Sequence, residues 1–246
     1  MNSYVGCHLS TTGGYAATVK TATSIGANTF AFFTRNPRGS KAKAEDPADT
    51  AAAMALLRES AFGPLVAHGA YTMNVCTADK EARAFATGVL EDDLRRMAAL
   101  PGNYYNFHPG CHVGQGTETG ISQICDALRK ALAPGYPVTV LLETMAGKGS
   151  EIGGKFEELK AIIDAVGSDR VVGLDRLYAL HLNDSKNPFA SHKDRHELLG
   201  QGNLGMKTFE NIVNCEALRG KPMILETPND LPGYAAEIEA LRKLQK

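Results

Sequence analysis

Residue types that can bind metal ions are concentrated between residues 180 and 205, in the stretch LHLNDSKNPFASHKDRHELLGQGNLG. His181 follows a short apolar run with strand character, so we expect it where a strand passes into a loop. Asp194 and His196 are two residues apart, and in an extended backbone that spacing points both side chains to one face. An imidazole and a carboxylate directed to one point suit Zn, Mn or Fe. A solvated polar loop uses the same residue types, so this stretch alone leaves both interpretations open.

Further histidines and glutamates stand at the ends of other short apolar runs. These residues are His8, His68, His108, Glu143 and Glu226. One histidine at the end of a strand is more often a structural residue than a ligand. Six His or Glu residues at equivalent strand ends, His181 included, are difficult to explain in that way. In a parallel barrel these ends meet, so the sequence predicts a metal-binding cage large enough for more than one ion.

The elements that must position these side chains alternate along the chain. Strand-length apolar runs are predicted at residues 4–9, 29–33, 65–67, 104–107 and 138–142, and helices at 14–25, 48–61, 118–132, 156–166, 206–215 and 234–244. A further helix after Thr77 is predicted to bury Phe85, Val89, Leu94 and Met97, with Asp79 or Thr77 as its cap. Such alternation implies parallel strands. Because no Gly-x-Gly-x-x-Gly follows the first strand and no P-loop occurs, a (β/α)8 TIM-type barrel is favoured over a doubly wound sheet.

Composition is consistent with one α/β domain over residues 1–246. The chain has 43% apolar residues and a net charge of −1, and its five cysteines form no metal-knuckle spacing, which favours reduced thiols in a cytoplasmic protein. No apolar run approaches the roughly 20 residues of a membrane span, so we expect no membrane partner. Basic side chains form two local clusters, one of Arg35, Arg38, Lys41 and Lys43 and one of Lys186, His192, Lys193 and Arg195. Each cluster is either a set of phosphate contacts or ordinary solvated surface.

Eight segments, in order along the chain, carry a specific resemblance. They are CHLSTTGG, FFTRNPR, AHGAYTMNV, NFHPGCH, LLETMAGKGSEIGGKFEEL, LHLNDSK, DRHELLGQGNLG and ILETP. Together they resemble the endonuclease IV family of apurinic/apyrimidinic endonucleases. The resemblance implies a (β/α)8 barrel with three zinc ions that works as a monomer on double-stranded DNA containing abasic sites. It further implies DNA repair by cleavage 5′ of the abasic site, which leaves a 3′-hydroxyl and a 5′-deoxyribose phosphate.

The resemblance also implies roles for individual residues. His68 and His108 match ligands of the first zinc, and Glu143 matches the carboxylate that bridges it to the second zinc and takes part in catalysis. The remaining matches are His181 and Glu226 to the second zinc, Asp194 and His196 to the third, Arg38 and Tyr71 to loop residues that enter the DNA, and His8 and His112 to residues that orient ligands.

One part of the family pattern is missing. Only Asp175 and Arg176 separate the apolar runs 171–174 and 177–182, whereas two neighbouring parallel strands need a crossover of about a dozen residues. The sequence therefore predicts a barrel that lacks most of one strand–helix unit near residues 170–177, together with the Asp and His that this unit carries in the family. Seven of nine expected ligands remain, so we expect one to three zinc ions and a less stable chain. Asp175 is a candidate replacement for the lost Asp.

Two other functions compete with an active nuclease. The first is a non-catalytic or weakly active family member that binds fewer zinc ions. The second is a metal-dependent sugar isomerase-like barrel, which also places His, Glu and Asp at strand ends. The DRHELLGQGNLG segment and the loops that carry Arg38 and Tyr71 argue against the isomerase.

Overall fold

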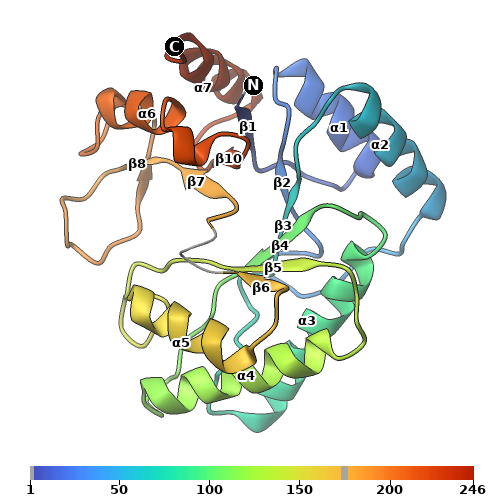
Figure 1. Cartoon of the computed structure of the whole chain (residues 1–246), viewed down its shortest axis with the longest axis vertical. Helices are drawn as coiled ribbons and strands as arrows, with labels where there is room; N and C mark the ends of the chain where they lie inside the picture. Colours follow the sequence, from blue (N-terminus) through green and yellow to red (C-terminus); the bar gives the residue numbers. More distant parts are fainter. Residues whose placement is uncertain (1–2, 173–176) are drawn as a thin grey trace. The chain divides into compact units, whose positions relative to one another are not determined.

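The computed structural model describes residues 3–172 and 177–246 of the chain, in which short strands alternate with helices (Figure 1). The chain divides into two compact units. Unit 1 consists of Met1–Phe32, Asp46–Val66 and Tyr178–Lys246, and unit 2 of Phe33–Glu45 and Ala67–Leu177. The sequence passes from one unit to the other within strands β2 (Ala31–Phe33) and β3 (Val66–His68). None of the described helices is long and apolar enough to cross a bilayer.

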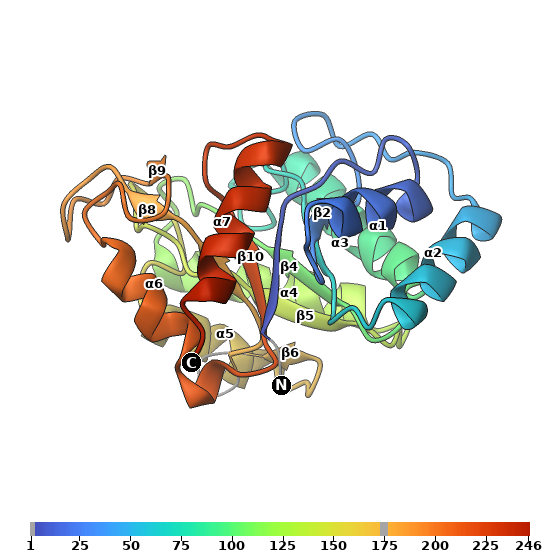
Figure 2. The same ribbon diagram turned by 90° about the horizontal axis from the view of Figure 1, so that it is seen from above.

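Unit 1 is built around a parallel sheet in the order β1-β10-β7, formed by Tyr4–Cys7, Pro222–Leu225 and Leu180–Leu182. Its central strand β10 is buried along its whole length. The helices of this unit are α1 (Tyr15–Ser24), α2 (Pro47–Glu59), α6 (Met206–Val213), the 3-10 turn η2 (Glu216–Leu218) and α7 (Leu231–Lys243). Helix α7 packs along β1, and α1 packs beside α2 (Figure 2).

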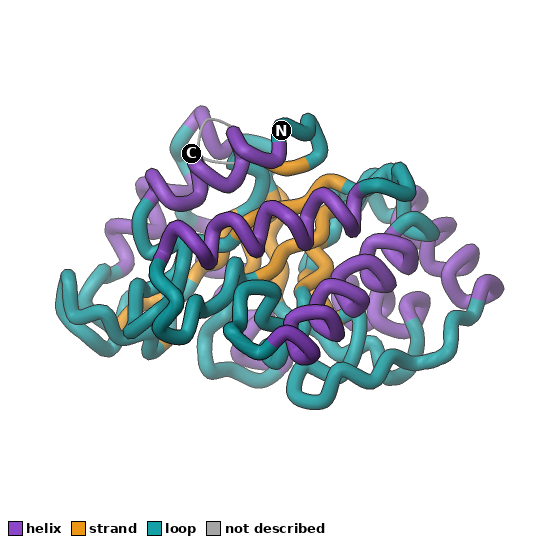
Figure 3. The backbone as a smooth tube through the Cα atoms, turned by 90° about the horizontal axis from the view of Figure 1, so that it is seen from below, coloured by secondary structure: helices purple, strands orange, loops and turns teal. Residues whose placement is uncertain are grey.

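Unit 2 contains the parallel strands β4 (Tyr104–Phe107), β5 (Thr139–Leu142) and β6 (Val171–Val172). Its helices are α3 (Lys80–Met97), α4 (Thr117–Leu132) and α5 (Phe156–Val166), and α4 packs against both of the others. Apolar side chains from these helices, among them Leu90, Leu94 and Leu128, are fully buried. The tube in Figure 3 shows how much of the chain is loop between these short strands and longer helices.

The starts of α3 and α7 follow from side-chain capping. The Asp79 side chain accepts hydrogen bonds from the backbone amides of Glu81 and Ala82, so Asp79 rather than Thr77 caps α3. Asp230 caps α7 in the same way through Gly233, and the helix therefore begins at Leu231, three residues before the predicted start. The prediction for Phe85 is wrong. Its side chain is 63% exposed, because α3 buries the face that carries Ala86, Leu90 and Leu94.

Two further features concern the segment around the predicted missing unit. No helix lies between β6 and β7 within the described part of the chain, whereas a helix joins each pair of consecutive strands from β1 to β6. Asp175, the candidate replacement ligand, lies outside the described residues. After β7, an antiparallel pair that the sequence did not predict joins β8 (Asp184–Ser185) to β9 (His196–Glu197).

Candidate metal centres

The first candidate centre is formed in unit 2 by His68, His108 and Glu143. Strands β4 and β5 are in register with Phe107 opposite Leu142, so His108 and Glu143, the next residues, leave the sheet side by side. The Nε2 atoms of His68 and His108 lie 3.0 Å and 3.5 Å from the same carboxylate oxygen, Oε2 of Glu143. One ligand atom from each residue lies within 4.8 Å of the others. This is a two-histidine, one-carboxylate set of the kind that catalytic zinc uses.

Neighbouring groups fix the orientation of this first cluster. His68 is almost fully buried, and its Nδ1 lies 2.7 Å from the backbone carbonyl oxygen of Gly69, which leaves Nε2 directed at Glu143. Asn106 donates from Nδ2 to Oε2 of Glu143 at 2.6 Å. Sequence reasoning missed Asn106, although a signal was present: it precedes His108 by two residues in an extended strand and therefore faces the same side.

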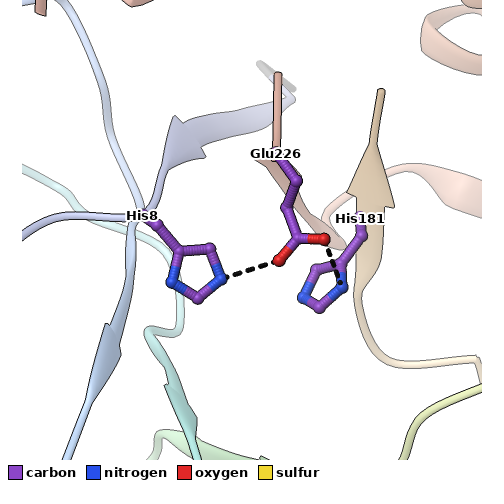
Figure 4. Close-up of side chains that lie close together, drawn as sticks. All are labelled: His8, His181 and Glu226. Atoms are coloured by element: carbon purple, nitrogen blue, oxygen red, sulfur yellow. Dashed lines mark ion pairs between the residues drawn. The ribbon is translucent and has the colours of Figure 1, made fainter. Parts of the chain in front are cut away.

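The second candidate centre is formed in unit 1 by His8, His181 and Glu226 (Figure 4). Cys7 of β1 pairs with Leu225 of β10, so His8 and Glu226 follow at one edge of the sheet. The two carboxylate oxygens of Glu226 face different rings: Oε1 lies 2.9 Å from Nε2 of His8, and Oε2 lies 3.2 Å from Nδ1 of His181. All three side chains are about four-fifths buried.

His8 stands among the ligand-type side chains, as its position at a strand end predicts, and not only in the orienting role that the resemblance implies. The resemblance implied that His8 orients a ligand, whereas the structure brings it into the same group of three ligand atoms as His181 and Glu226. The other histidine expected to orient a ligand, His112, accepts a hydrogen bond at Nδ1 from the amide of Gly116 within its own loop.

The pair expected to bind a third metal ion, Asp194 and His196, stands outside both groups of three. Nε2 of His196 lies 2.9 Å from Oδ1 of Asp194, and its Nδ1 lies 2.6 Å from the backbone oxygen of Glu226. The hydrogen bond to Asp194 is the largest cause of a raised pKa for the imidazole. The Asp194 side chain is 70% exposed. Among residues 3–172 and 177–246, no third group of three ligand-type side chains is present.

The residues expected to enter DNA lie on two loops of unit 2 that are joined to each other. Arg38 is exposed, and Tyr71 is 57% exposed. The amide of Tyr71 donates to the carbonyl of Pro37 at 3.0 Å, and the hydroxyls of Ser40 and Thr72 lie 2.9 Å apart. The centroids of the Tyr71 and His108 rings are 5.8 Å apart. The structure thus holds Tyr71 beside the first cluster and ties its loop to that of Arg38.

Asp184, in the HLND segment, organises the Gly-rich turn that follows β9. It is fully buried, and its carboxylate accepts hydrogen bonds from the backbone amides of Ser185 at 2.7 Å, Leu204 at 2.8 Å and Gly205 at 3.1 Å. Desolvation by burial acts to raise the pKa of Asp184, but these amide donors outweigh it and the pKa is lowered. Sequence reasoning assigned no role to Asp184.

Comparison with known proteins identifies the family. The model of the xylose isomerase-like TIM-barrel family matches the chain in two segments, residues 19–174 and 169–244. A protein named "Probable endonuclease 4" from Alkaliphilus oremlandii is 50% identical over 97% of this chain and 96% of its own length. The chain belongs to the endonuclease IV family of xylose isomerase-like TIM barrels. A crystal structure of endonuclease IV from Thermus thermophilus matches with a TM-score of 0.81 and 30% identity, covering 98% of each chain.

The same comparisons bear on the missing unit and on the isomerase alternative. The alignment with the A. oremlandii relative spans 270 positions, more than the 246 residues of this endonuclease IV-family chain, so the relative has residues with no counterpart here. The two family-model segments overlap at residues 169–174, where the sequence predicts the missing strand–helix unit.

A D-psicose 3-epimerase from Clostridium cellulolyticum also matches the structure, with a TM-score of 0.68 at 11% identity, covering 98% of this chain and 99% of its own. At this identity the match shows the TIM-barrel fold alone.

The donor sets of the two clusters fit the zinc ions that the endonuclease IV family implies. Zinc accepts imidazole nitrogen and carboxylate oxygen, and tetrahedral bonds of about 2.0–2.1 Å place its ligand atoms roughly 3.3 Å apart. The three ligand atoms of each cluster already lie within 4.8 Å of one another. In the first cluster the Nδ1 contact of His68 supplies the orienting partner that metal-bound histidines usually have. Small side-chain rotations are therefore enough to accept an ion.

Proposed function

We propose that this protein is a metal-dependent DNA repair endonuclease that cleaves the phosphodiester 5′ of an abasic site in double-stranded DNA. The observation that carries the proposal is the presence of two separate His2Glu clusters in a chain that belongs to the endonuclease IV family over its full length. The products are a 3′-hydroxyl and a 5′-deoxyribose phosphate. We propose zinc as the metal, because the donors are imidazoles and carboxylates in groups of three.

The bound ions supply Lewis acidity toward a phosphoryl oxygen and lower the pKa of a water molecule. The chain's own residues hold and orient the reacting groups. His68, His108 and Glu143 form the first centre, and the Asn106 amide, which donates to Oε2 of Glu143, keeps the carboxylate in one orientation. Glu143 is the catalytic residue in this proposal, because its carboxylate lies beside both histidines and accepts hydrogen bonds.

Recognition of the damaged strand falls to the two joined loops of unit 2. Arg38 and Tyr71 are exposed, and Tyr71 presents an aromatic ring next to the first centre. An abasic nucleotide leaves the base stack at low cost because it has no paired base, and this difference supports selection of the lesion. The side chains of Arg38 and Tyr71 are suited to fill the gap that the missing base leaves.

The test is cleavage of a duplex with one synthetic abasic site, in the presence of Zn²⁺. We expect the wild-type protein to cut 5′ of the site and Glu143→Gln to lose at least about a hundredfold in rate, the scale of loss seen when one group that stabilises a transition state is removed. His192→Ala, which removes an imidazole from the exposed loop after β8, is the matched control and should retain wild-type activity. Folded, zinc-loaded wild-type protein that does not cut would identify a non-catalytic family member and refute the proposal.

A further inference from the structure

We propose that His8 is a direct metal ligand in this chain, where it completes the second centre with His181 and Glu226, and that the chain holds two metal ions rather than three. The inference rests on the proposed function only in treating the two clusters as metal centres. It assigns to His8 the place left by the aspartate that the resemblance expects from the missing strand–helix unit.

The backbone brings His8 to this place without help from the missing segment. β1 and β10 pair from Tyr4 opposite Pro222 to Cys7 opposite Leu225, so His8 and Glu226 are the next residues on adjacent parallel strands. β7 pairs with the other side of β10 and places His181 opposite Ile224. The three ligands therefore come from three adjacent strands of one sheet in unit 1, whose register is fixed by buried residues such as Ile224 and Leu225.

The side chains converge on one point (Figure 4). The Glu226 carboxylate lies between the two imidazoles, with one oxygen 2.9 Å from His8 and the other 3.2 Å from His181. The two rings are 5.9 Å apart between centroids and are inclined by 62°, so they do not stack on each other. One oxygen of Glu226 and one nitrogen of each imidazole lie within 4.8 Å of one another, which compares with about 3.3 Å between the ligand atoms of a tetrahedral zinc site.

The same geometry argues against a third ion. Asp194 and His196 supply two ligand atoms, whereas zinc sites in proteins generally have at least three protein ligands. Nδ1 of His196 already faces the backbone oxygen of Glu226, so only Nε2 is directed at Asp194. Because His8 takes the place of an aspartate, the second centre also has one negative charge fewer. The bound ion is then less neutralised by its protein ligands than with two carboxylates.

Metal stoichiometry tests the inference without any nuclease assay. Chelator-treated protein is titrated with Zn²⁺ by isothermal calorimetry, and the zinc that survives gel filtration is counted by elemental analysis. We expect two zinc ions per wild-type chain. His8→Ala should retain one ion and bind a second more than about a hundredfold more weakly, beyond the roughly 10–100-fold loss typical of a residue that only orients a ligand, as should His181→Ala. His192→Ala and Asp194→Ala should both retain two.

Three zinc ions in the wild-type protein, or two in His8→Ala at unchanged affinity, would overturn the assignment. Circular dichroism shows whether His8→Ala is folded. If it is not, His8→Gln keeps a side chain of similar size and polarity that ligates zinc poorly, and it replaces the alanine variant in the same titration. The metal count and the cleavage assay fail independently: loss of the second ion in His8→Ala supports the inference even if the wild-type chain does not cut DNA.

Discussion

Replacing Asp93 by alanine tests whether the buried ion pair of unit 2 holds the loop that carries Arg38. Asp93 on α3 has no exposed surface, and one of its oxygens accepts hydrogen bonds from Nε and Nη2 of Arg35 at 2.9 Å and 2.7 Å. Its other oxygen accepts from the hydroxyl of Tyr105 at 2.7 Å. Arg35 in turn donates from Nη1 to the backbone oxygen of Ser40, two residues after Arg38 in the same loop. The pair thus connects the buried face of α3 to the loop that carries Arg38.

The expected loss of stability follows from what remains after the substitution. Burial raises the pKa of Asp93, so the ion pair is formed at a desolvation cost and its net contribution is small. Removing only the carboxylate is different, because the guanidinium of Arg35 stays buried with Asp92 as its remaining ionic partner. Breaking one side of a buried pair costs about 3–5 kcal/mol. Tyr105→Phe removes a single hydrogen bond to a charged group and should cost about 1.5–3 kcal/mol.

The assay is equilibrium unfolding in urea, followed by circular dichroism and by tyrosine fluorescence. Asp126→Ala on α4 is the matched control, because Asp126 is 72% exposed and its ion pair with Arg129 is worth at most about 1 kcal/mol. We expect the free energy of unfolding to fall in the order Asp126→Ala, Tyr105→Phe, Asp93→Ala. A value for Asp93→Ala within about 1 kcal/mol of wild type would refute the reasoning, since it would mean that Arg35 finds other partners or water.

Three further outcomes are expected. Gly6→Ala should destabilise the protein by at least about 1–3 kcal/mol in thermal unfolding, because its Cβ would lie 1.9 Å from the backbone oxygen of Thr29. Gly88→Ala on α3, where nothing lies within 4 Å, should instead be neutral or stabilising by up to about 1 kcal/mol. The pKa of Asp184 is lower in the folded protein than in a free carboxyl, so its ionised form stabilises the fold above the free-carboxyl pKa of about 4. Stability should therefore fall as the pH drops below about 4. In Asp184→Asn this loss of stability with falling pH should be smaller. Removal of zinc with a chelator should lower the free energy of unfolding by about 2.7 kcal/mol for each site that was held at a free zinc concentration of about a hundred times its Kd, and the melting temperature should fall with it. An unchanged melting curve would argue against bound metal.

The sequence was sufficient for the features that depend on local order. Strand-end positions identified His68, His108 and Glu143, which the structure brings together, and the acidic residue before α3 was one of the two caps proposed. It was not sufficient where a residue's role depends on its distance to residues far away in the sequence. The end of a strand is equally suited to a ligand and to a residue that orients one, so only the contact with Glu226 places His8 in the second cluster.

Other differences have similar physical reasons. Val89, Leu94 and Met97 are buried as the helical period of α3 predicts, whereas Phe85 is exposed. The period indicates an apolar face, but packing decides where the centre of the buried face lies. Strands β8 and β9 have two residues each, which is too short for any period to appear in the sequence. Two of the amides that donate to Asp184, those of Leu204 and Gly205, come from a turn about twenty residues further along the chain, a contact that no local pattern specifies.

The hydrogen bonds between the Arg38 loop and the Tyr71 loop have a consequence for the energetics of binding. Two independent exposed loops would each lose conformational entropy when DNA orders them, and that loss would reduce the affinity. Here the contact between Tyr71 and Pro37 and that between Ser40 and Thr72 restrict both loops in the unliganded protein. Under the proposed function, most of this entropy is lost during folding rather than on encounter with DNA, so the two side chains act as one preorganised wedge.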